Sequence, residues 1–148
     1  MKKVLFLSLL VFSTQSFALD QTCISHIENL EKKLENCTVE YQDNATTSEM
    51  NNAVYASADC AQKVAHELFD VYYASTSAQS KELYDALVQQ IYMHAHHLNQ
   101  DSDYAKKYHT GTMYNSIAIA EAEEMVKTLT KGYLKQSKSE CQEFLDKE

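Results

Sequence analysis

The sequence of 148 residues contains no proline, no tryptophan and no arginine, and only two glycines, Gly111 and Gly132. Proline and glycine mark turns and interrupt helices, so a chain almost without them favours long helices joined by short polar loops. No segment shows the strict alternation of apolar and polar residues that is typical of a half-buried strand. Two isolated glycines also exclude a glycine-rich loop that could cradle a phosphate group.

The amino-terminal residues 1–18 have the pattern of a secretion signal. Lys2 and Lys3 precede an apolar run, and a cleavage site with small residues ends at Ala18. The apolar run is far shorter than the roughly 20 residues that a membrane-spanning helix needs. We therefore expect a protein exported to the periplasm, with a signal peptide at 1–18 and a single helical domain at 19–148.

The net charge of the chain indicates which classes of macromolecule it can bind. The chain has 13 lysines and 21 acidic residues, and 11 of the lysines lie outside the expected signal peptide, which gives the mature protein a net charge of −10. Such a surface argues against nucleic acid as a partner, because binding phosphates requires cations on the protein. It would instead attract a basic macromolecule, and more strongly at low salt.

Apolar residues recur at steps of three and four along four segments, which predicts an up-and-down all-α bundle of about four helices. The expected helices cover residues 21–41, about 47–75, about 78–99, and 112 to the carboxyl end. The third helix is expected to line the core with Leu83, Leu87, Ile91 and Leu98, flanked by Tyr84, Val88 and Ala95. The last helix is expected to line it with Met113, Ile117, Ala118, Ala122, Met125, Leu129 and Tyr133. The opposite, solvated face of the last helix is expected to carry Glu121, Glu123, Glu124, Lys127 and Lys131.

Four cysteines in an exported chain predict two disulfides, with three possible connectivities. Cys23 and Cys37 fall on the first expected helix, about 21 Å apart along its axis, whereas a disulfide needs α-carbons within about 7 Å of each other. In an up-and-down bundle the first helix begins beside the end of the last, which favours Cys23 with Cys141 and leaves Cys37 with Cys60. Buried free thiols are the alternative.

The cluster His94-Ala95-His96-His97 is the first place to look for metal chemistry. His94, His97 and Asp101 are spaced to share one face of a helix, and imidazole binds zinc or copper. Further ligands would have to come from elsewhere in the fold, for example from His66, His109 or Glu67. The alternative is that His94 packs on the apolar stripe while its neighbours are solvated.

Motifs of catalysis are missing. No serine stands in a Gly-x-Ser-x-Gly setting, and cysteines in disulfides cannot act as thiolates. Adjacent acids such as Glu123 and Glu124 on a helix surface lack the burial that separates the pKa values of glycosidase carboxylates. We expect a protein that is not an enzyme and needs no cofactor.

Ten tyrosines are more suggestive of binding. Tyrosine is amphipathic and is enriched at protein interfaces. Several of these residues surround the polar connection before the last helix, and we expect this corner to contact a partner. The expected contact residues are Tyr104, Tyr108, Gly111, Met113 and Tyr114. The alternative is that most of the rings belong to the core and only their hydroxyls reach the surface.

Two blocks of the sequence carry a family resemblance. One runs from Cys37 through TTSEMNNA to ADCAQKVAHELFDVYY, and the other is YHTGTMYNSIAIAEAEEMVKTLTKGYLK. Together they resemble the LprI-like lysozyme inhibitor family over about residues 37–135, with its Thr-x-x-Glu-Met start and its Tyr-x-Gly-Gly-Ser-Met corner. The chain departs from the family pattern at Ala53 and Glu121, which stand where the family has cysteines.

The resemblance implies an all-helical periplasmic module that binds and inhibits a lysozyme-like peptidoglycan hydrolase. Such enzymes are typically cationic, which agrees with the acidic charge of this chain. Two other functions fit the same residues. One is an immunity or adaptor protein for a secreted toxin, and the other is a metal-binding periplasmic protein that uses His94 and His97.

Overall fold

The structure is a computed structural model that describes residues 22–101 and 113–145, with the side chains of 98–101, 113–115 and 144–145 left out. Across these two ranges the chain forms four helices and no strand, which confirms the expected all-α bundle. The helices are residues 22–35, α2 (Thr47–Tyr72), α3 (Ser77–Asp101) and α5 (Met113–Leu145).

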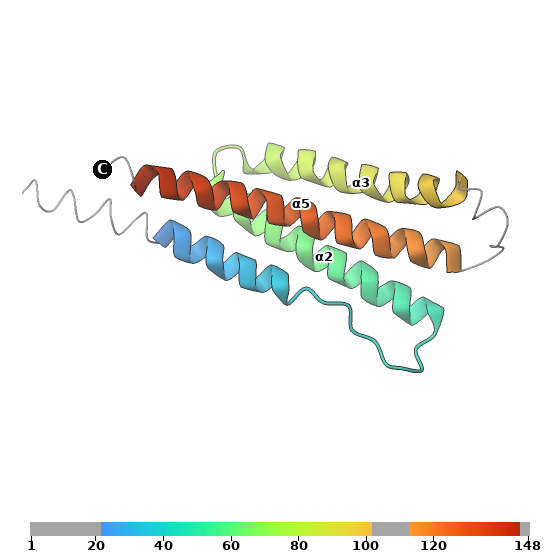
Figure 1. The fold of residues 1–148 in the computed structure, drawn as a ribbon. Helices are drawn as coiled ribbons and strands as arrows, with labels where there is room; N and C mark the ends of the chain where they lie inside the picture. Colours follow the sequence, from blue (N-terminus) through green and yellow to red (C-terminus); the bar gives the residue numbers. More distant parts are fainter. Residues whose placement is uncertain (1–21, 102–112, 146–148) are drawn as a thin grey trace, which may run out of the picture.

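Successive helices run in opposite directions, so the topology is up-and-down (Figure 1). The long helices α2 and α5 lie side by side through the length of the molecule, with α3 along one side and the short helix 22–35 along the other. Within the two described ranges, no helix combines the length and apolarity that crossing a bilayer requires.

A capping box fixes the start of α2 where the sequence places it. The Thr46 hydroxyl accepts a hydrogen bond from the Glu49 amide at 3.3 Å, and the Glu49 carboxylate accepts one from the Thr46 amide at 2.7 Å. These bonds satisfy two of the amide groups that a helix leaves free at its amino end. The backbone hydrogen bond from Thr46 also holds the pKa of Glu49 below its usual value.

The first helix ends at residue 35, so the expected range of 21–41 was too long. Asn36 and Thr38 have side chains that compete for backbone hydrogen bonds, and the β-branched Val39 follows them. Cys37 therefore lies in the connection after the helix rather than on it. Its backbone carbonyl accepts a hydrogen bond from the Ser57 hydroxyl at 2.9 Å, which holds the connection against α2.

Two disulfides join the elements, in the pairing that the bundle topology favoured. Cys23 is bonded to Cys141, with 6.3 Å between their α-carbons, and ties the start of the first helix to the last turns of α5. Cys37 is bonded to Cys60, with 5.6 Å between α-carbons. Because Cys37 is not helical, the connection can bend toward the middle of α2.

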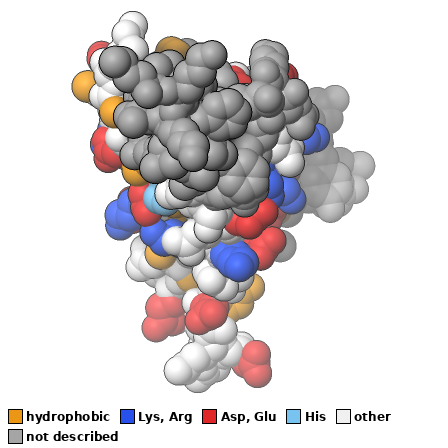
Figure 2. Space-filling view, turned by 90° about the vertical axis from the view of Figure 1, so that its left-hand side faces the viewer, with side chains coloured by type: hydrophobic (Ala, Val, Ile, Leu, Met, Phe, Trp, Pro, Cys, Tyr) orange, Lys and Arg blue, Asp and Glu red, His pale blue; other side chains and the backbone are white. Residues whose placement is uncertain are grey.

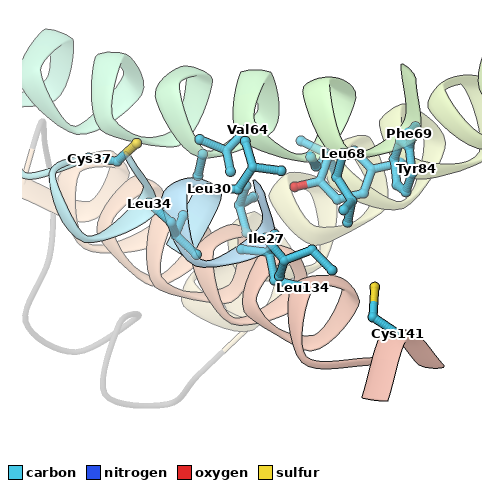
Figure 3. Packing of buried hydrophobic residues seen from close by; sticks show 14 residues of the cluster. Ile27, Leu30, Leu34, Cys37, Val64, Leu68, Phe69, Tyr84, Leu134 and Cys141 are labelled. Carbon is cyan, nitrogen blue, oxygen red and sulfur yellow. The ribbon is translucent and has the colours of Figure 1, made fainter. Parts of the chain in front are cut away.

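The core fills the space between the first helix, α2, α3 and α5 (Figure 3). Its largest wholly buried side chains include Tyr84, Phe69, Ile27 and Leu30. Tyr84 lies edge-on to Phe69, and its hydroxyl is 2.6 Å from the buried Thr130 hydroxyl. Thr130 in turn donates to the carbonyl of Val126 at 2.9 Å, so both hydroxyls have partners.

Two helices bury faces that differ from the expected ones. In α3 the buried residues are Tyr84, Val88 and Ala95, while Leu83 is 60% exposed. In α5 the buried positions are Ala118, Ile119, Ala122, Glu123, Val126, Thr130, Leu134, Ser137 and Cys141. Ile117 and Met125, expected in the core, are 39% and 42% exposed. Both helices are thus rotated, and part of each apolar stripe faces outward.

Candidate binding surfaces

Most of the predicted partner-binding corner lies outside the described residues. Tyr104, Tyr108 and Gly111 fall within 102–112. Met113 and Tyr114 belong to the first turn of α5, but their side chains are outside the described part. The expected role of this corner therefore stays a prediction, and the candidate surfaces below come from other residues.

The histidine cluster lies on α3, where His94 and His97 are both exposed. Asp101 is the last residue of α3, and its side chain lies outside the described part. Among the described residues, no group of three or more histidine, cysteine or acidic side chains is placed to hold a metal ion. The metal site through His94, His97 and Asp101 stays an untested prediction.

An apolar groove runs between α3 and α5, and we call it the α3–α5 groove. Two adjoining hollows of about 390 and 290 Å³ share Ile91, Met125 and Leu129. The remaining lining residues are Leu87, Gln90, His94, Glu124 and Thr128. The groove exists because both helices turn part of their apolar stripes outward. Ile91 and Leu129 still pack partly against the core, whereas Met125 is 42% exposed.

The apolar surface extends beyond the groove along α3. Leu83 precedes Leu87 by one helical turn and therefore lies on the same side of the helix. It is 60% exposed, although leucine is normally among the most buried residues. Contiguous exposed apolar side chains of this kind typically mark an interaction site.

A second groove lies where the amino-terminal half of α2 meets α3 and α5, and we call it the tyrosine groove. It has a volume of about 480 Å³. The rings of Tyr55 and Tyr92 form its aromatic wall, with their centroids 5.8 Å apart and their planes tilted by 33°. The remaining lining residues are Ser48, Asn51, Asn52, Met93, His96, Ala118 and Ile119.

Negative charge lies close to the tyrosine groove. Burial, followed by the charges of Tyr55, Glu123 and Asp59, raises the pKa of Tyr92 to about 12. The Tyr92 hydroxyl is therefore protonated at neutral pH and can donate a hydrogen bond. Neither carboxylate lines the groove itself, and each is paired with a lysine, Asp59 with Lys63 and Glu123 with Lys127.

Glu123 was predicted to be solvated, and this was wrong, because the residue is only 3% exposed. Its carboxylate lies 2.6 Å from the Ser57 hydroxyl, whose single proton it shares with the Cys37 carbonyl, and it pairs with Lys127 at 2.8 Å. The pair with Lys127 agrees with the four-residue spacing in the sequence. Burial of one partner makes this ion pair structural, since a buried charge must be compensated.

A third hollow, of about 420 Å³, separates the first helix from α5. Its lining mixes acidic residues, among them Glu31 and Glu35, with Lys127 and Lys131. On the end of the bundle that Figure 2 shows, acidic and basic side chains are likewise interspersed. This mixture favours ion pairs within the protein over selection of a ligand of one sign.

Among the described residues, His66 and Asp85 form an arrangement that resembles part of a catalytic site. The His66 Nε2 atom is 2.7 Å from the Asp85 carboxylate, which also accepts a hydrogen bond from the Gln62 amide at 2.6 Å. In hydrolases such a pair activates a hydroxyl or thiol nucleophile. Within the described ranges, no serine, threonine or cysteine forms a hydrogen bond with His66. The contacts of His66 and Gln62 with Asp85 join α2 to α3.

Sequence reasoning missed both grooves. The spacing of Leu83, Leu87 and Ile91 is that of a buried stripe, and nothing local in the sequence distinguishes a core face from an exposed one. A weak signal existed for the tyrosine groove, since Asn51 and Asn52 precede Tyr55 by four and three residues and so share its face. The spacing of residues along the sequence could not predict that Tyr92, on another helix, lies beside Tyr55.

No protein-family model, no curated protein and no solved structure matches the chain. The resemblance to the LprI-like lysozyme inhibitor family is therefore a prediction that rests on the quoted motifs alone.

Proposed function

We propose that the protein is an exported, periplasmic binding module that docks a cationic protein in the α3–α5 groove and performs no catalysis of its own. The observation that carries the proposal is the groove itself. Leu87 and Ile91 face Met125 and Leu129 across it, and Met125 leaves 42% of its surface in solvent. A groove between two helices with apolar side chains one turn apart suits an amphipathic helix or an apolar loop of a partner.

Charge supports a cationic partner. The expected mature chain carries −10, and Glu124 lines the groove beside Met125. Complementary charge at the rim of an apolar patch accelerates association and selects among partners, and it loses strength as salt rises.

The rigid frame of the bundle supports binding without rearrangement. The two disulfides hold the first helix and its following connection on the long helices. Disulfides persist in oxidising compartments, which agrees with export to the periplasm. A preformed surface loses little conformational entropy on binding, so more of the contact energy contributes to affinity.

Among cationic partners, the resemblance favours a lysozyme-like peptidoglycan hydrolase, which the protein would inhibit by covering its cleft. The test is a muramidase assay in which the oxidised protein is titrated against c-type, g-type and phage-type lysozymes at low and moderate salt. We expect inhibition of one class at micromolar concentration, and weaker inhibition at the higher salt.

The variant Leu87→Gln with Met125→Gln tests the groove. We expect inhibition at least tenfold weaker, because both side chains would lose apolar contact with the partner. Val71→Gln is the matched control, since Val71 is 57% exposed on α2 and does not line the groove. Equal inhibition by both variants would contradict docking in the α3–α5 groove.

Failure to inhibit any lysozyme class would contradict the hydrolase as partner. The same pair of variants can then be compared in binding to a basic toxin from the producing cell, which is the partner expected of an immunity or adaptor protein. If only the groove variant loses binding to the toxin, the α3–α5 groove is the docking site and the partner is the toxin rather than a hydrolase.

A further inference from the structure

We propose that the tyrosine groove is a second binding site, which takes an organic cation: an alkylammonium or a guanidinium group. The site lies at the other end of α3 from Leu83, and among the described residues the two grooves have no lining residue in common. The inference therefore does not depend on the proposed function.

The aromatic wall provides the first attraction. A ring face carries partial negative charge, so a cation within about 6 Å of a ring centroid is attracted to it. Tyr55 leaves 47% of its surface in solvent, and Tyr92 stands beside it with a ring centroid 5.8 Å away. A cation that sits against the exposed part of this pair is within reach of both rings.

The charges around the groove are compatible with a bound cation. The carboxylates of Asp59 and Glu123 are close enough to Tyr92 to act on its hydroxyl. Both are already paired, Asp59 with Lys63 at 2.6 Å and Glu123 with Lys127 at 2.8 Å. Their charges are therefore largely compensated and neither is free to coordinate a small ion, while no lysine among the described lining residues opposes a cation.

The polar lining determines which cations fit. The side-chain carbonyls of Asn51 and Asn52 can accept hydrogen bonds from N–H groups, whereas Met93, Ala118 and Ile119 offer apolar contact. Sodium would lose its hydration shell here without charged ligands to replace it. Alkylammonium and guanidinium groups are more weakly hydrated and bring apolar or planar surfaces that match the groove.

The experiment uses the oxidised full-length protein in nuclear magnetic resonance titrations at constant ionic strength. Tetramethylammonium chloride and arginine amide are the probes, and sodium chloride replaces them in the reference samples. We expect saturable shifts of the Asn51 and Asn52 side-chain amides with both probes. The absence of saturable shifts with either probe would overturn the proposal.

The variant His96→Lys tests both where the probes bind and whether the site prefers a positively charged ligand. His96 lines the groove and is exposed, so the substitution adds a fixed positive charge without disturbing the core. His97→Lys is the matched control, because the adjacent residue is also exposed but does not line the groove. We expect His96→Lys to weaken binding of both probes at least tenfold and His97→Lys to leave it almost unchanged. Equal weakening in both variants would indicate a general charge effect and overturn the site.

Further ligands in the same titration identify the source of the cation. Spermidine and the peptide Gly-Arg-Gly compare a free polyamine with a protein side chain, and tighter binding of either is consistent with the site. Tri-N-acetylchitotriose is the uncharged comparison. If it alone shifts the Asn51 and Asn52 amides, and does so equally in His96→Lys, the site binds saccharides and the proposal is wrong.

Tyr55→Leu provides a second variant, in which we expect weaker cation binding with an unchanged melting temperature.

Discussion

At the scale of single residues, the buried Tyr84 makes the free energy of unfolding depend on pH. Burial, the largest influence, raises the pKa of Tyr84 to about 12, from an ordinary value near 10. The unfolded chain therefore loses this proton at lower pH than the folded one. The stabilisation that results is complete below about pH 10 and is lost as pH rises toward 12. For a side chain that is 0% exposed it amounts to about 2 to 3 kcal/mol.

We expect the free energy of unfolding to fall steeply between about pH 10 and pH 12, measured by urea unfolding monitored by circular dichroism. Tyr84→Phe is the control, because phenylalanine keeps the ring and cannot ionise. The slope of stability against pH should be shallower in this variant. Identical slopes in the two proteins would show that Tyr84 does not cause the loss.

The buried pair of Glu123 and Lys127 makes a different prediction. Lys127→Met leaves the Glu123 carboxylate buried without its counter-charge, and we expect a loss of about 3 kcal/mol in the free energy of unfolding. The double variant Glu123→Leu with Lys127→Met removes both charges and should recover most of that loss. Urea unfolding of the two variants measures the difference. A double variant as unstable as Lys127→Met alone would show that the effect is lost packing rather than an unpaired charge.

At the scale of the helix, Gly132 interrupts the long α5. A β-carbon added at this position would meet no atom within 4 Å, so alanine fits without displacing a neighbour. We expect Gly132→Ala to stabilise the protein by about 0.5 to 1 kcal/mol, because glycine loses more backbone entropy than alanine when a helix forms. Ala120→Gly, at an exposed position of the same helix, should destabilise by a similar amount. The melting temperature measures both, and a lower value for Gly132→Ala would contradict the prediction.

Local chemistry predicted where α2 begins and that α3 and α5 are helices. Thr46 and Glu49 determine the start of α2 within four residues of sequence, so their capping box could be read directly. The end of the first helix could not, because Cys37 leaves the helix to reach Cys60 and Ser57, which are distant in sequence.

The spacing of apolar residues could not predict which face of each helix is buried. Apolar residues occupy more than one face of α3 and α5, and contacts with other helices decide which face is buried. In α3, Asp85 bonds to His66 and Gln62 of α2, and Lys81 pairs with Asp70 at 2.6 Å. These polar contacts direct one side of α3 toward α2 and leave Leu83 outside. Both candidate grooves result from this rotation.

At the scale of the whole molecule, the two disulfides close loops of very different length. Cys23 and Cys141 are separated by 118 residues, and Cys37 and Cys60 by 23. A longer loop restricts the unfolded chain more, so replacing the first pair by serine should cost about 4 to 5 kcal/mol and replacing the second about 3 kcal/mol. Thermal unfolding of the two double-serine variants measures the order. A larger loss from the Cys37 and Cys60 pair would contradict this account.

The topology of the bundle was predictable because short connections between consecutive helices make neighbours antiparallel, and this order favoured the pairing of Cys23 with Cys141. Cys23 and Cys141 meet only if the first and last helices are neighbours with opposite directions, as Figure 1 shows. The binding surfaces were not predictable in the same way. Each consists of side chains from helices that are far apart in the sequence, such as Tyr55 and Tyr92.

The bond between Cys23 and Cys141 also makes the chain between them a covalent ring. A protease that cuts one connection inside this ring, for example between α2 and α3, opens the ring but releases no fragment. The cut protein keeps its mass and, because the helices remain packed, its surfaces as well. In the periplasm, to which the sequence predicts export, the ring would let the folded protein survive a first proteolytic cut.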